Sequence, residues 1–173
     1  MTDPREALIV ELDRVRHGAG EVAADTPVLR SPSCGDEVRM AVTLTGGAGG
    51  AGGAGGTVDG TIADVTIADV TWRGRGCTVS MASASALAAL ASGRSRAELA
   101  ALAVSFGELV RDRDVDPAFD PLDPGDALRY DERLGDAVAF AGIGRLPLRA
   151  GCATLPWEAL SEALSAALDA ALE

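Results

Sequence analysis

The chain has 173 residues, of which 47% are hydrophobic, so we expect one ordinary core and a single domain over residues 1–173. Its formal net charge of −11 argues against a nucleic-acid partner, because phosphate is normally met by a basic face. The N-terminus lacks the pattern of a signal peptide and no apolar run approaches ~20 residues, so we expect no membrane association and a cytoplasmic location.

The first part of the chain predicts one helix, one strand and one loop. Residues 4–17 carry apolar side chains at helical spacing, with the single histidine, His17, as a surface or capping residue at the end. Residues 18–30 predict a mixed loop or strand, and the alternation over 38–45 predicts a strand. The glycine-rich stretch 46–60 has little to bury, so we expect a flexible hairpin loop.

The pentapeptide Thr-Ile-Ala-Asp-Val occurs twice in tandem, at 61–65 and 66–70. Because five is an odd number, the second copy would show the opposite face from the first in one continuous strand. We predict that 66–70, which leads into the second cysteine, is the core strand. The copy at 61–65 should extend the hairpin, bulge or fray.

The second half of the chain is predominantly helical in pattern. Small residues over 78–91 and a clear apolar stripe over 95–113 predict two helices. Aspartates and prolines over 112–126 lack the regular spacing of a calcium loop, so we interpret this stretch as a solvated linker. A shorter helix is expected over 131–140, and a last helix with Pro156 in its first turn.

Three cysteines and one aspartate are the candidate functional residues. Cys34 and Asp36 flank a glycine, which lets a turning backbone aim a thiol and a carboxylate at one point. Cys77 and Cys152 each follow a glycine at the predicted start of a helix, where the helix dipole favours thiolate. In a reducing cytoplasm, three cysteines are better interpreted as metal ligands, reactive thiols or small buried residues than as a disulfide framework. Their wide separations do not choose among these.

The local sequence around each cysteine is more specific. The stretches are Ser31-Pro-Ser-Cys-Gly-Asp36, Gly76-Cys-Thr-Val-Ser-Met-Ala-Ser-Ala-Ser85 and Arg149-Ala-Gly-Cys-Ala-Thr-Leu-Pro-Trp157. They resemble the three motifs of the IscU/NifU-like iron–sulfur cluster assembly superfamily, and particularly its SufU branch. The resemblance implies an α+β fold in which a small antiparallel sheet is packed by helices, with a metal site at one end.

Residue by residue, the resemblance places metal ligands at Cys34, Asp36, Cys77 and Cys152. Gly151 stands where scaffold members carry a histidine, and a long insert separates the second and third cysteines, as in the SufU type. That branch contains zinc and accepts persulfide sulfur from a pyridoxal-phosphate-dependent cysteine desulfurase of the SufS type. The resemblance therefore implies a Zn²⁺-dependent sulfurtransferase that feeds downstream iron–sulfur assembly proteins.

Within that implied mechanism, Cys152 is the thiol expected to receive the sulfur, with Cys34 as second choice. Arg149 and Arg75 are candidates to stabilise the transferred sulfur or to contact the partner, although both could be ordinary solvated arginines. Two alternatives stay open: a scaffold that binds a [2Fe–2S] cluster on the same ligands, and a structural zinc protein without transfer activity.

The chain also departs from the SufU pattern. The segment Leu12–Glu21 lacks the aromatic and histidine-containing stretch that usually precedes the first motif, and the glycine-rich loop and the duplicated pentapeptide are additional. If that segment contacts the desulfurase, the partner surface of this chain differs.

Overall fold

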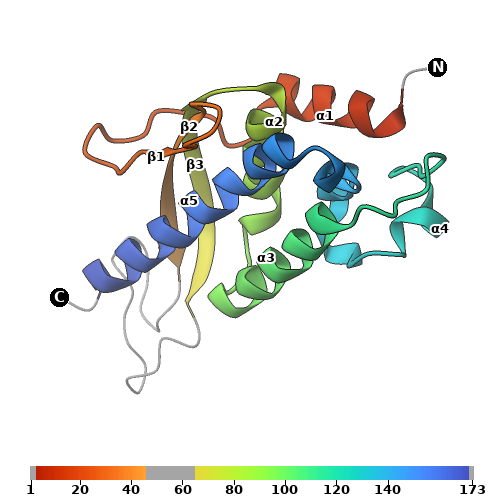
Figure 1. The fold of residues 1–173 in the computed structure, drawn as a ribbon. Coiled ribbons are helices and arrows are strands. Elements are labelled where there is room, and N and C mark those ends of the chain that lie inside the picture. The colour runs from red at the N-terminus through yellow and green to blue at the C-terminus, as the bar shows by residue number, and fades with distance from the viewer. Residues whose placement is uncertain (1–2, 46–64, 172–173) are drawn as a thin grey trace.

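The computed structural model describes residues 3–45 and 65–171, in which helices pack against a small antiparallel sheet (Figure 1). This arrangement confirms the α+β prediction. In chain order the elements are α1 (Pro4–Val15), β1 (Leu29–Arg30), β2 (Glu37–Thr45), β3 (Thr66–Arg75), α2 (Thr78–Ala91), α3 (Arg96–Arg111), α4 (Pro124–Ala127), the 3₁₀ helices η2 (Glu132–Phe140) and η3 (Ile143–Arg145), and α5 (Pro147–Ala171). The predicted hairpin loop 46–60 and all but the last residue of the first pentapeptide copy lie outside the described residues. None of the helices described is long and apolar enough to cross a bilayer.

The sheet has the order β1-β2-β3, and the helices cover one of its faces. Helix α5 runs diagonally across this face, while α2 lies against β3 (Figure 1). The side chains of the covered face are buried because strand residues alternate between faces; they include Val38, Met40, Ile67, Val70 and Trp72. Arg39 and Arg73, which are paired across β2 and β3, lie on the opposite face.

A β-bulge lies in the pentapeptide copy at 66–70. The pairing shifts between Thr43 and Leu44 of β2, which leaves Ala68 of β3 without a partner. The extra residue changes the face that the following side chains occupy, so Ile67 and Val70 are both buried although they are three positions apart. The second copy is therefore the core strand, as predicted.

The central helices follow the sequence patterns closely. Helix α2 begins and ends at the predicted residues, and it is buried on almost every side because its alanines and serines allow close approach. Helix α3 begins after Ser95, which forms a capping box with Glu98. The predicted helix 131–140 is a 3₁₀ helix whose helical conformation is interrupted at Gly135.

The last helix begins earlier than predicted. The sequence predicts Pro156 in the first turn, but α5 starts at Pro147, so Pro156 lies inside the helix and Cys152 lies in its second turn. Because proline has no N–H, the Cys152 carbonyl receives no helical hydrogen bond from position 156. At the neighbouring position the buried Ser83 hydroxyl donates to the Ala153 carbonyl at 2.6 Å, which adds a partner beside this break.

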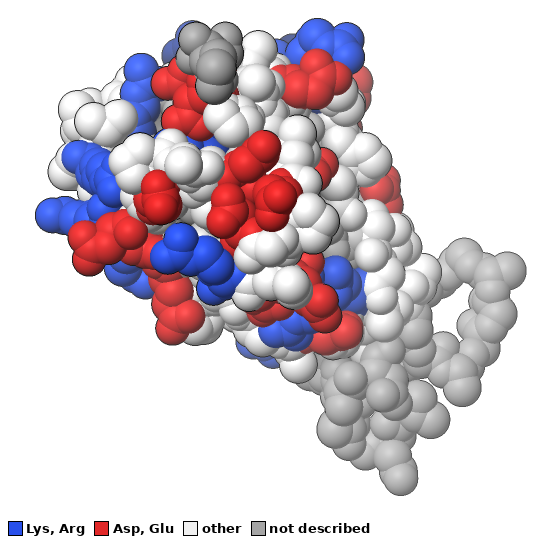
Figure 2. Space-filling model, turned by 90° about the vertical axis from the view of Figure 1, so that its right-hand side faces the viewer, with Lys and Arg blue, Asp and Glu red and all other residues white. Residues whose placement is uncertain are grey.

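The aspartate-rich stretch 112–126 is not simply a solvated linker. Its carboxylates accept nearby backbone N–H groups and so stabilise turns: Asp112 accepts from Asp114, Asp116 from Ala118, Asp120 from Leu122 and Asp123 from Gly125. Figure 2 shows acidic side chains gathered on the face of the molecule that includes α4. Val115 and Phe119 nevertheless lie in the core, which corrects the linker interpretation. Among the described residues these aspartates form no metal-spaced cluster.

The segment after α1 covers the free edge of β3. Trp72 is fully buried and exchanges backbone hydrogen bonds with Gly18 and Gly20, both at 2.9 Å. Its indole N–H donates to the His17 carbonyl at 2.7 Å, and the Arg16 guanidinium lies 5.2 Å from its ring centroid. A side chain at Gly18 would meet Ala88 and the Val70 carbonyl at 2.7 Å, so this stretch requires glycine.

Tyr130→Phe tests a hydrogen bond that links the segment between α4 and η2 to the end of α3. The Tyr130 hydroxyl donates to Asp112 at 2.7 Å; burial and this bond raise the pKa of Tyr130 to about 12, and the bond lowers the pKa of Asp112. The variant should lose about 1 kcal/mol of unfolding free energy at neutral pH. The difference should shrink as pH falls below the usual Asp112 pKa of 3.8, or as it rises from 10 towards 12. Urea unfolding across pH measures it, and a constant difference would contradict the assignment.

Candidate metal centre

Three predicted ligand residues meet at one end of the β2–β3 hairpin. The Sγ atoms of Cys34 and Cys152 lie 3.3 Å apart. One ligand atom from each of Cys34, Asp36 and Cys152 lies within 4.8 Å of the other two. Three segments distant in sequence therefore present two thiols and a carboxylate to one point.

A tight turn between β1 and β2 aims the first pair. The Ser31 N–H donates to the Asp36 carbonyl at 2.9 Å, and the Gly35 N–H donates to the Ser31 carbonyl at 3.1 Å. Gly35 has a φ of 74°, a conformation that few other residues adopt. The Cys34 thiol donates to the Ser31 hydroxyl at 3.0 Å, so buried Ser31 also orients the thiol.

The Asp36 carboxylate is held by the start of α2. The Cys77 N–H donates to Oδ1 at 3.2 Å, and the Ser80 hydroxyl donates to Oδ2 at 2.8 Å. Burial is the largest single influence on the pKa of Asp36 and raises it. Hydrogen bonds from Ser80 and from the three thiols together outweigh burial, so the pKa lies below its usual value. The carboxylate is thus kept charged although Asp36 is buried, with only 5% of its surface exposed.

The two close thiols differ in accessibility. Cys34 is exposed, whereas Cys152 is buried at 2% exposure. Burial, followed by contact with Cys34, Cys77 and Asp36, raises the pKa of the Cys152 thiol far above its usual value. The prediction that a helix start favours thiolate at Cys152 is wrong, because α5 begins at Pro147 and the thiol lies inside the helix.

Cys77 stands beside this group rather than within it. It is the N-cap of α2, as predicted, and is half-buried. Its Sγ lies 3.9 Å from the Ser80 hydroxyl, and its thiol is among the groups that raise the pKa of Cys152. The structure thus brings three of the four predicted ligands together and places the fourth next to them.

The other predicted or considered residues are not part of the cluster of ligand side chains. Arg149 is exposed in the first turn of α5, and exposed Arg75 pairs with Glu37 at 3.2 Å. His17 is exposed at the end of α1 and contributes its backbone to Ser85 and Trp72. In the described ranges, the group of metal-spaced side chains includes no histidine.

These residues fit a zinc ion. Thiolate and carboxylate are zinc ligands, and a structural site normally has four of them. Two Zn–S bonds of ~2.3 Å in a tetrahedron hold their sulfurs about 3.8 Å apart, so the 3.3 Å pair would need to open only slightly. Deprotonation of a buried thiol with a raised pKa is favoured by a bound cation.

Two residues that orient the site, Ser31 and Ser80, were not singled out from sequence. Ser80 follows Cys77 by three positions, which places the two on one helical face, so the spacing carried a signal. For Ser31 only its place in the first motif could have indicated a role.

The chain is similar in sequence to two known proteins. No protein-family model matches the chain. It is 28% identical over 165 residues to the iron–sulfur cluster assembly scaffold protein IscU of Streptococcus pyogenes serotype M1, covering 95% of this chain and 84% of the relative. It is 27% identical over 137 residues to the zinc-dependent sulfurtransferase SufU of Bacillus subtilis strain 168, covering 79% of this chain and 72% of the relative. These similarities support assigning the chain to the IscU/NifU-like superfamily.

The fold of this IscU/NifU-like chain agrees with a solved relative. The N-terminal part of a NifU-like protein from Brucella abortus superposes with a TM-score of 0.67. The superposition covers 96% of both chains at 16% sequence identity, so it supports the fold alone.

Ser80→Ala should weaken metal binding without removing a ligand. The change deletes the 2.8 Å hydrogen bond that orients Asp36, and loss of such a partner typically lowers metal affinity about 10–100-fold. Zinc affinity measured by chelator competition checks this. Ser85→Ala is the matched control, since Ser85 is equally buried in α2 but accepts from His17 instead. Equal affinities in the two variants would contradict a role for Ser80 in the site.

Proposed function

We propose that this chain is a zinc-dependent sulfur acceptor that takes persulfide sulfur from a cysteine desulfurase for iron–sulfur cluster assembly. The observation that carries the proposal is the convergence of Cys34, Asp36 and Cys152 within 4.8 Å, with Cys77 alongside. Likeness to a scaffold protein and to a sulfurtransferase supports iron–sulfur assembly in general, and the two sequence identities, 28% and 27%, do not distinguish them.

One feature favours sulfur transfer over cluster scaffolding. Gly151 offers no side chain where scaffold members carry a histidine, and the single histidine of the sequence lies exposed at the end of α1. The ligand set is then three thiolates and one carboxylate, which suits zinc. Cys34, Asp36, Cys77 and Cys152 would hold the ion, which would keep the thiols deprotonated near neutral pH.

The transfer step needs one nucleophilic thiolate on this chain. That thiolate attacks the terminal sulfur of the desulfurase persulfide; a new S–S bond forms here, the donor S–S bond breaks, and the donor cysteine leaves as thiolate. The receiving atom belongs to the pair Cys34–Cys152. The family motif favours Cys152, whereas exposure favours Cys34. Arg149, exposed one turn before Cys152, is placed to contact the partner.

The experiment combines metal analysis with sulfur loading. Wild type, Cys34→Ser, Asp36→Ala, Cys77→Ser and Cys152→Ser are purified anaerobically and analysed for zinc, iron and acid-labile sulfide. Each protein is then incubated with a SufS-type desulfurase and cysteine, and intact mass spectrometry detects added sulfur. We expect about one zinc per wild-type chain. Zinc binding should be weakened in all four variants. Sulfur loading should be lost with the receiving cysteine.

The alternatives give different results. Iron with acid-labile sulfide in the wild type would favour the scaffold. Stoichiometric zinc with neither sulfur loading nor stimulation of the desulfurase would favour a structural zinc protein. Stoichiometric zinc retained in Cys152→Ser would contradict the proposed ligand set. A reducing cytoplasm suits the three free thiols, and that location remains a prediction.

A further inference from the structure

Strand β2 is paired unequally along its two edges. One edge pairs with β3 from Glu37 to Thr45, whereas the other pairs with β1 only at Glu37 and Val38. Among the described residues, no backbone hydrogen bond joins Arg39–Thr45 to the loop before β1. We call this part of β2 the open edge. It presents N–H and C=O groups that can pair with another strand.

Strand β1 is short because the chain before it turns away from the sheet. Pro27 has no N–H to donate to β2. The Thr26 N–H instead donates to the Ala23 carbonyl at 3.1 Å, which closes a turn. The Ala24 carbonyl accepts from the Arg39 guanidinium at 2.7 Å, so a side chain of β2, rather than its backbone, holds the loop.

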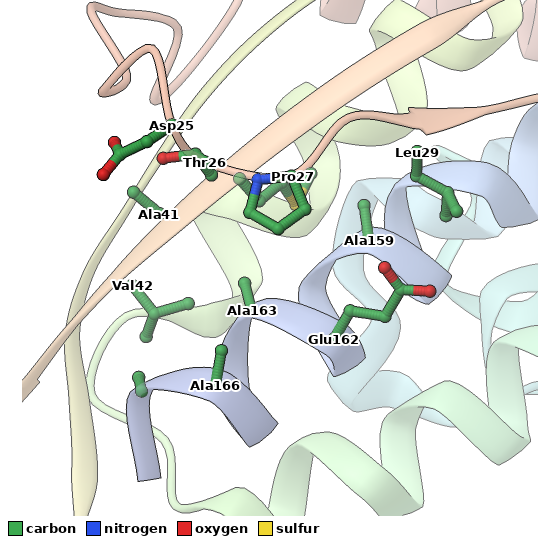
Figure 3. A pocket seen from close by; sticks show the side chains of 12 residues that line it. Asp25, Thr26, Pro27, Leu29, Ala41, Val42, Ala159, Glu162, Ala163 and Ala166 are labelled. Carbon is green, nitrogen blue, oxygen red and sulfur yellow. The ribbon is translucent and has the colours of Figure 1, made fainter. Parts of the chain in front are cut away.

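An apolar cavity of about 310 Å³ lies beside the open edge, between β2, the loop before β1 and α5. Figure 3 shows Pro27 facing the alanines of α5 across the cavity, with Ala41 and Val42 of β2 at its side. The α5 residues that line it are mostly small: Ala159, Glu162, Ala163, Ala166 and Ala167. The cavity is large enough for one aliphatic side chain.

The charged residues that line the cavity have one sign. Its lining includes two carboxylates, Asp25 and Glu162, which lie on opposite sides in Figure 3, and no basic residue. From Met40 to Thr45 the open edge carries no charged side chain. Proteins usually protect an exposed edge with charges, prolines or bulges. The surface is thus suited to an added strand that is apolar in the middle and basic at its ends.

We propose that the open edge and this cavity form a docking site for an extended basic–apolar peptide segment of a partner protein. The segment adds a strand to β2, places one apolar side chain in the cavity, and sets basic residues near Asp25 and Glu162. The site lies outside the metal centre and does not depend on the proposed sulfur transfer.

The test uses the full chain and a fluorescein-labelled peptide of eight residues that alternates threonine and valine, with a central leucine and an arginine at each end. Fluorescence anisotropy should show saturable binding. Ala163→Phe fills the cavity and should weaken binding about tenfold or more. The matched control Ala97→Phe, on the exposed side of α3, should not change it. Replacing both arginines with citrulline should weaken binding severalfold.

Backbone N-methylation distinguishes strand addition from simple burial of leucine. Because alternate N–H groups of an added strand face β2, methylation at one set of alternate positions should abolish binding, and methylation at the other set should not. Absent binding, equal binding by Ala163→Phe, or equal effects of the two methylated peptides would each overturn the proposal. A dimer of the chain alone that Ala163→Phe dissociates would also overturn it, by assigning the open edge to a second copy.

Discussion

Replacing Gly76 with alanine is expected to disable the metal centre although no ligand is changed. A Cβ at this position would lie 2.6 Å from Cγ of Asp36 and 2.8 Å from its Cβ and Oδ1. Because Cβ of Asp36 is fixed close to the backbone, rotation of the carboxylate alone does not relieve the overlap. Either the carboxylate leaves the thiols or the pairing of Glu37 with Arg75 opens. We expect zinc affinity to fall about 100-fold, at the upper end for loss of a residue that orients a ligand.

The matched control is Gly151→Ala, at the neighbour of Cys152. Apart from its chain neighbours and the backbone of its own helix, no atom lies within 4 Å of a Cβ built there, and Gly151 is exposed within α5. Alanine in a helix is favoured over glycine by about 0.5–1 kcal/mol, so this variant should bind zinc normally and unfold at a slightly higher temperature. Chelator competition measures the zinc affinity, and thermal unfolding measures the unfolding temperature. Normal zinc affinity in Gly76→Ala would show that Asp36 is not held as described.

Trp72→Ala is expected to have the largest effect on stability. The side chain is fully buried, and its loss removes the 2.7 Å hydrogen bond to the His17 carbonyl and the contact with Arg16. Replacing a buried large aromatic residue with alanine typically costs about 3–5 kcal/mol. Chemical denaturation should therefore show a large fall in the unfolding free energy, or a chain that does not fold.

Two milder variants separate the hydrogen bond from the ring. Trp72→Phe keeps an aromatic ring but leaves the His17 carbonyl without its donor. Trp157→Phe removes an indole N–H that has no partner among the described residues, while it keeps a ring that can stack on Phe106. Trp72→Phe should therefore destabilise the protein more than Trp157→Phe does. The reverse order would indicate that volume, rather than hydrogen bonding, governs both positions.

Much of the fold could be predicted because several local signals agreed. Helix α2 and strand β2 were placed within a residue of their observed bounds, since spacing, turn residues and helix starts pointed to the same limits. The start of α5 was missed because Pro156 gives the same signal at a first turn as it does inside a helix. Only packing distinguishes the two, and Ser83 supplies part of it through its bond to Ala153.

The candidate site was predicted as a set of residues but not as a geometry. Local motifs marked Cys34, Asp36, Cys77 and Cys152, and the structure brings three of them together. The contrast between exposed Cys34 and buried Cys152 depends on where α5 crosses the turn after β1, which no local pattern contains. The open edge of β2 was also beyond prediction, because it depends on how far the chain before β1 follows the sheet.

The antiparallel hairpin of β2 and β3 separates the two ends of the molecule. The pair Glu37 and Arg75 lies next to the metal centre, whereas Thr45 and Thr66 lie at the far end of the strands, roughly 25 Å away. Thr45 and Thr66 are therefore remote from the thiols. These two strand ends are suitable for attaching a fluorophore, which would report on the protein while the centre keeps its native surroundings.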